Sequence, residues 1–108
     1  MSVKVIIAPM ALQQLKNAAN WYRERAHSDE LARVWLDGFL DVLNSLQIDP
    51  ERYPLARESH RFAESLREVH YGSGRRKTHR ALFQIQGNVV HVLTVRHNAQ
   101  DDIDPDAV

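Results

Sequence analysis

The chain has 108 residues, no cysteine, and 14 acidic residues against 14 Lys and Arg. That length suits one domain with one hydrophobic core. The absence of cysteine excludes a disulfide framework and thiolate chemistry, and a net charge of zero excludes binding to polyanions by bulk charge alone.

The N-terminal half predicts one strand and then two helices. β-Branched residues alternate over 3–7 and favour a strand. Pro9 suits the first turn of a helix, where its missing N–H costs nothing, and apolar residues at helical spacing continue to about Arg25. Ser28 is a good N-cap for a second helix that reaches about Leu46. The apolar stripe of this second helix is wide enough to contact more than one neighbour.

The second half changes to the period of strands. Two prolines begin an irregular stretch over residues 49–64. Strands are expected at 66–71, 78–85 and 89–95. A Gly-Ser-Gly turn precedes the second of these strands, and a hairpin turn at 86–88 precedes the third. The third strand is nearly all apolar, which is typical of a central strand covered on both faces.

These elements predict an α+β domain over residues 1–98. It would consist of an N-terminal strand, a two-helix hairpin and a three-stranded antiparallel meander packed on the helices. Residues 99–108 form an acidic C-terminal tail. The apolar run at residues 1–7 is too short for a signal-peptide core or a membrane span, so we expect a cytoplasmic protein without membrane contact.

Charge is spread unevenly along this domain. Residues 57–80 hold seven Lys and Arg against three Glu, whereas residues 98–108 hold four Asp and no basic residue. The pattern allows two interpretations. It is either a solvated surface with a frayed acidic end, or a basic functional face that the tail partly shields.

Three stretches, taken in order, carry a resemblance to a known family. The first is a Leu-Arg strand, the second a strand with a central arginine and an aromatic residue three positions later, and the third an apolar strand with a basic, histidine-containing end. They are Ser65-Leu66-Arg67-Glu68-Val69, Thr78-His79-Arg80-Ala81-Leu82-Phe83 and Val90-His91-Val92-Leu93-Thr94-Val95-Arg96-His97. Over residues 3 to about 102 the chain resembles the RelE/ParE superfamily of toxins from type II toxin–antitoxin systems, of the plasmid stabilisation type.

The resemblance implies a growth-inhibiting toxin that a cognate antitoxin neutralises. Antitoxins of this kind use an acidic, amphipathic arm that folds on the toxin, either as a helix in a groove or as an added strand. The resemblance also implies a heterotetramer of toxin and antitoxin. We expect the arm's carboxylates to pair with Arg67, Arg80 or Arg96.

Members of the RelE kind cleave mRNA on the ribosome without a metal or other cofactor, and the resemblance implies which residues would do so here. Arg80 and Arg96 would hold the phosphate, because a guanidinium matches two phosphate oxygens. His97, or else His79, would exchange protons near neutral pH. The expected surface for antitoxin or target comprises Arg67, Arg75, Arg76, Lys77, His79 and Arg80. No cluster of residues has the spacing of a metal site.

The sequence leaves three functions open. The first is a ParE-like inhibitor of DNA gyrase that acts by binding, and the second is a RelE-like ribosome-dependent endonuclease. The third is a non-toxic binding module on the same scaffold. Two departures argue against RNA cleavage: His79 stands where the family usually has an aromatic residue, and the chain is neutral. Trp21 and Trp35 are assigned to the core or an interface, and no base-stacking platform is evident.

Overall fold

The computed structural model describes residues 3–108. Met1 and Ser2, which begin the apolar N-terminal run, lie outside the described residues. The helices and strands are, in order, β1 (Lys4–Ile7), α1 (Pro9–Ala26), α2 (Asp29–Asn44), β2 (Arg67–Tyr71), β3 (His79–Gln86) and β4 (Val89–His97), with four short 3₁₀ turns between or after them. This arrangement confirms the predicted α+β fold.

The four strands form one mixed sheet in the order β1-β4-β3-β2. β2, β3 and β4 make the predicted antiparallel meander. β1 pairs parallel with β4, with Lys4 opposite Val89 and Ile7 opposite Val92. The sequence pattern predicted the first strand but not its neighbour in the sheet. Because β4 therefore has a strand on each side and layers on both faces, nearly every residue in it can be apolar.

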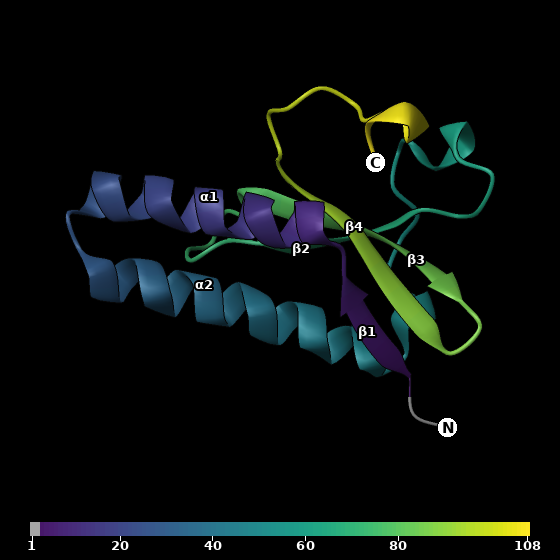
Figure 1. Cartoon of the computed structure of the whole chain (residues 1–108), viewed down its shortest axis with the longest axis horizontal. Coiled ribbons are helices and arrows are strands. Elements are labelled where there is room, and N and C mark those ends of the chain that lie inside the picture. The colour runs from purple at the N-terminus through teal and green to yellow at the C-terminus, as the bar shows by residue number, and fades with distance from the viewer. Residues whose placement is uncertain (1–2) are drawn as a thin grey trace.

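The helices begin where the sequence indicates. Pro9 is the first residue of α1, and Ser28 caps α2 by accepting a hydrogen bond from the Leu31 N–H at 3.1 Å. Asp29 and Glu30 lie in the first turn of α2, where the helix dipole favours negative charge. The two helices run side by side across one face of the sheet (Figure 1). Among residues 3–108, no helix is long and apolar enough to cross a membrane.

The larger core lies between these helices and the sheet. Its fully buried side chains include Leu15 and Phe39 from the helices and Phe83 and Val92 from the strands. Tyr71 donates a hydrogen bond to the Trp35 carbonyl at 2.8 Å. A Cβ at Gly38 would overlap the Tyr71 hydroxyl. Glycine at that position therefore leaves room for the Tyr71 hydroxyl beside α2.

A second, smaller core covers the opposite face of the sheet, which we call the outer face. It contains Ala56, Leu66, Leu82 and Ile103. The C-terminal segment lies beside the irregular stretch around residue 60 (Figure 1). Ion pairs reinforce this contact, since Arg57 bonds Asp102 and Arg61 bonds Asp104 at 2.8 Å.

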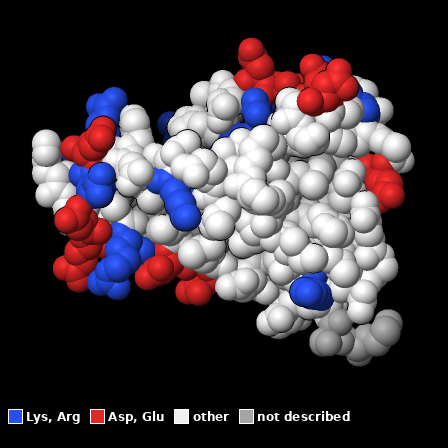
Figure 2. Space-filling view, viewed as in Figure 1, with Lys and Arg blue, Asp and Glu red and all other residues white. Residues whose placement is uncertain are grey.

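The acidic tail is therefore a packed part of the structure. Ile103 is 3% exposed, and the tail's aspartates reach two arginines of the basic region. This contact corresponds to the interpretation in which the tail shields a basic face. Figure 2 shows the acidic side chains gathered beside basic ones over this C-terminal segment.

Candidate functional site

The ends of β3 and β4 bring four of the predicted site residues into two pairs. Arg80 lies directly opposite Arg96 in the strand register, and His79 lies opposite His97. Because successive side chains of a strand point to opposite faces, the two pairs are separated by the sheet. The arginines lie on the outer face. The histidines lie on the helix side, where His79 packs against Trp35 and His97 packs against His79.

Arg80 is almost completely enclosed, with 1% of its surface exposed. Its guanidinium donates two hydrogen bonds to Glu58 and one to Glu68 at 2.9 Å. These bonds, led by that to Glu58, raise the pKa of Arg80. Burial raises the pKa of Glu58, but hydrogen bonds from Arg80 and from the Ile103 N–H outweigh burial and lower it to about 2. Both groups are therefore charged at neutral pH, and their charges cancel locally.

Arg96 and Arg67 have partners within the chain as well. Arg96 donates to the Asp101 carbonyl at 2.7 Å. Arg67 donates to the carbonyls of Glu51 and Tyr53 at 3.1 and 2.7 Å. Arg96 thus holds the tail against the outer face. Arg67, whose register partner is Phe83 of the larger core, instead holds the start of the irregular stretch on the helix side of the sheet. Both arginines therefore have a structural role.

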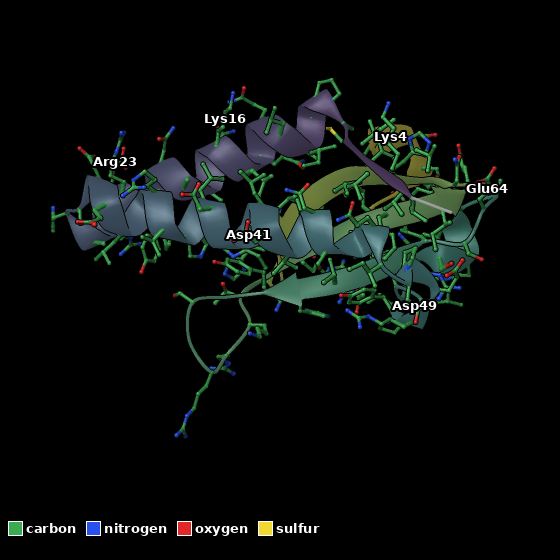
Figure 3. The ribbon with its side chains drawn as sticks, turned by 90° about the horizontal axis from the view of Figure 1, so that it is seen from below. Lys4, Lys16, Arg23, Asp41, Asp49 and Glu64 are labelled. Carbon is green, nitrogen blue, oxygen red and sulfur yellow. The ribbon has the colours of Figure 1, made fainter. Side chains whose placement is uncertain are left out.

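Arg75, Arg76 and Lys77 are the predicted site residues with the most open surroundings. All three are exposed in the loop between β2 and β3. Figure 3 shows this loop extending away from the body of the molecule after the end of β2. Among residues 3–108, none of the three forms an ion pair.

His79 and His97 meet at the end of the sheet beneath the helices. Their ring centroids are 5.1 Å apart. Burial, and then the neighbouring His97, lower the pKa of His79 to about 4, so it is neutral at physiological pH. His97 is exposed and lies across the sheet from Arg80 and Arg96. The structure thus does not bring the three proposed catalytic residues together.

Glu58 and Glu68 are the important residues that the sequence did not single out. Arg80 interrupts an apolar strand, so its charge needs either a polar face or a carboxylate, and the sequence prediction assigned the carboxylate to a partner protein. Glu68 could have been found, because it shares a face of the sheet with His70, the register partner of Arg80. Glu58 lies in an irregular segment, where no periodic pattern predicts its direction. Within residues 3–108, no three metal-ligating side chains cluster.

The fold and this site define a class of protein: a small α+β domain with two helices on one face of a meander and a strand arginine neutralised on the other. A family model described as "ParE toxin of type II toxin-antitoxin system, parDE" matches residues 5–102. Because that match spans most of the chain, the chain belongs to the ParE toxin family.

A solved structure supports the fold independently of the family model. The chain is similar to one in "Chromosomal ParDE TA system from P. aeruginosa", with a TM-score of 0.68 and 16% sequence identity over 88% of this chain and 95% of that chain. At this identity the likeness shows a shared fold. No curated protein matches the chain in sequence.

Proposed function

We propose that this chain is a growth-inhibiting toxin that acts by binding DNA gyrase, and that a cognate antitoxin neutralises it. The observation that carries the proposal is the state of Arg80. Glu58 and Glu68 occupy its guanidinium, and the sheet separates it from His97. This geometry favours a binding protein over a nuclease.

The physical argument concerns what cleavage of RNA would need. A metal-independent nuclease needs a proton acceptor and cations that touch one substrate together. At 1% exposure, Arg80 could reach a phosphate only by leaving its carboxylates. Breaking such a buried pair costs about 3–5 kcal/mol. Inhibition by binding requires no such set of residues.

Two assays on the purified chain test the proposal. We expect it to block supercoiling of relaxed plasmid by purified gyrase, and to leave mRNA intact in a reconstituted translation reaction. Cleaved mRNA with unaffected supercoiling would establish the RelE-like alternative. Neither effect, together with normal growth on expression, would establish the non-toxic binding module.

The antitoxin arm is proposed to bind at the edge of β1. Among residues 3–108, β1 pairs only with β4, so its other edge is open for an added strand. Ile6, Met10 and Leu12 near this edge are 37–39% exposed, and Figure 2 shows a broad surface with few charged side chains over β1 and the start of α1. Pairing of the arm with Arg67, Arg80 or Arg96 would instead require it to replace acceptors already within the chain.

Hydrogen exchange on the complex with the antitoxin encoded beside the toxin gene tests this placement. We expect the amides of Lys4–Ile7 to gain protection. Protection confined to the outer face, around Arg80 and Arg96, would move the arm there and overturn the β1 site.

A further inference from the structure

Both tryptophans of the chain line one pocket beside α1. The pocket has a volume of about 170 Å³, and Tyr22, His79 and His97 complete its aromatic walls. Trp21 is 55% exposed, more than a residue serving only the core requires. Flat π surfaces on several sides favour a planar ring as the ligand.

A polar groove of about 210 Å³ continues from this pocket and shares His79 and His97 with it. Gln14 and Gln100 line the groove, and hydrogen bonds fix the direction of both amides. The side-chain oxygen of Gln14 accepts from the Val95 N–H at 2.7 Å, and that of Gln100 accepts from the His97 N–H at 2.7 Å. Because a backbone N–H can only donate, each amide must turn its NH₂ group the other way.

His97 adds a third donor to the groove. Its Nδ1 accepts a hydrogen bond from the Ala99 N–H at 3.0 Å. The ring proton of neutral His97 must therefore be on Nε2. Among residues 3–108, the Nε2 groups of Gln14, Gln100 and His97 have no hydrogen-bond acceptor. The groove thus presents donors, and its ligand should bring acceptors.

Positive charge lies on the other side of the pocket. Ser73 and Thr78, at the two ends of the loop that carries Arg75–Lys77, line the pocket. Arg25 lies over the Trp21 ring, with its guanidinium carbon 4.8 Å from the ring centroid. The groove therefore offers neutral donors, and the cationic loop begins and ends at the wall of the pocket.

We propose that this pocket and groove bind single-stranded nucleic acid. One base would enter the aromatic pocket and stack on Trp21, while the flanking phosphates would contact the amide donors and the Arg75–Lys77 loop. Base stacking on aromatic side chains beside a cationic track is the usual mode of sequence-tolerant single-strand binding. An acidic peptide would satisfy the donors, but it would not need planar walls. This binding is separate from gyrase inhibition and from the antitoxin edge at β1.

Tryptophan fluorescence tests the pocket directly, because both tryptophans lie in it. We expect a single-stranded DNA or RNA 12-mer to quench the emission of the full chain. By fluorescence anisotropy with a labelled 12-mer, Trp21→Ala should weaken binding about tenfold. Val34→Ala is the matched control, since Val34 is 56% exposed on α2 and does not line the pocket. Equal affinities for both variants and the parent chain would overturn the proposal.

Salt dependence tests the loop. The double variant Arg75→Ala/Arg76→Ala should bind the 12-mer at least tenfold more weakly and with a shallower dependence on salt, since each lost phosphate contact reduces the slope. Lys4→Ala/Arg52→Ala removes the same charge at the far end of the sheet, where Figure 3 labels Lys4, and should change little. An equal loss in both double variants would show attraction by bulk charge only.

Quenching by an acidic peptide but not by the 12-mer would assign the pocket to a protein ligand. Either result overturns the proposal, and because gyrase is absent from these assays, neither bears on the proposed toxicity.

Discussion

The two faces of the sheet are covered in different ways. Regular helices cover one face, and the buried side chains between them and the sheet are apolar or aromatic. The outer face is covered by an irregular stretch and the acidic tail, which enclose a few apolar residues around the Arg80–Glu58 pair. A small domain can therefore close both faces of its sheet, but by interactions that respond differently to mutation, pH and salt.

The difference comes from what each interaction costs to form and to break. Apolar burial contributes roughly 25 cal/mol per Å², so the helix face gains stability in proportion to its area. A buried ion pair contributes little net stability, because desolvation offsets its attraction, but removing one partner strands the other charge. The outer face should therefore be the more sensitive to single changes of charge.

The largest expected effect is that of Glu58→Gln. This change leaves the Arg80 guanidinium buried with weaker acceptors, and we expect a loss of about 3–5 kcal/mol in the free energy of unfolding. Urea denaturation measures it. Glu24→Gln, an equivalent change at an exposed position of α1, should shift stability by less than about 0.5 kcal/mol. A small loss at Glu58 would mean that the pair opens to water and that the two faces do not differ as described.

Acid should lower the free energy of unfolding over two pH ranges, one set by a residue on each face. The folded pKa of His79, about 4, lies below its usual 6.5, so the unfolded chain binds more protons between these values. The contribution of His79 to stability is then fully present above pH 6.5, and the free energy of unfolding falls by at most about 3 kcal/mol as the pH drops to 4. The folded pKa of Glu58, about 2, lies below its usual 4.5, so its contribution is lost as the pH falls from 4.5 to 2.

Matched variants separate the two pH ranges. The free energy of unfolding, measured by urea denaturation at a series of pH values, should lose its fall over the upper range in His79→Gln and over the lower range in Glu58→Gln. If His79→Gln keeps the full slope between pH 6.5 and 4, another group carries that titration and the helix-face assignment is wrong.

A smaller effect tests the close approach on the helix face. Gly38→Ala would push against the Tyr71 hydroxyl and break its hydrogen bond to the Trp35 carbonyl. We expect a loss of about 1–3 kcal/mol in thermal or urea unfolding. In a Tyr71→Phe background the same change should cost less than about 1 kcal/mol, because the overlapping oxygen is gone. Equal costs in the two backgrounds would contradict the contact.

The helix face is also the one that the sequence predicted best. Apolar spacing predicted both helices, and the Ser28 cap and Pro9 located their starts. Alternation predicted β3 and β4 to within two residues at each end. The parallel pairing of β1 with β4 could not be predicted in this way, because it joins segments some 85 residues apart and depends on how the helices return the chain to the sheet.

The outer face shows where local patterns stop being informative. The sequence singled out Arg80 and Arg96 correctly as charges in need of partners, and the strand register places them side by side. One partner, Glu68 of β2, follows from strand alternation. Glu58 lies in an irregular segment and the Asp101 carbonyl lies in the tail, and neither helical nor strand periodicity predicts the position of these two. The prediction grouped His97 with Arg80 and Arg96, although alternation along β4 already implies that His97 and Arg96 face opposite sides of the sheet.

The smallest expected effect separates burial from charge as the source of the difference between the faces. Arg61 and Asp104 form an ion pair at 2.8 Å on the outer face, but the Asp104 side chain is 68% exposed. Exposed pairs contribute about 0–1 kcal/mol and are screened by salt. Asp104→Asn should therefore cost less than about 1 kcal/mol in urea unfolding, and less still in 1 M NaCl. Asp37→Asn, which removes the exposed Arg33–Asp37 pair at 3.9 Å on α2, should behave in the same way. If Asp104→Asn instead costs as much as Glu58→Gln, the tail's charges and not the enclosed Arg80–Glu58 pair hold the outer face closed.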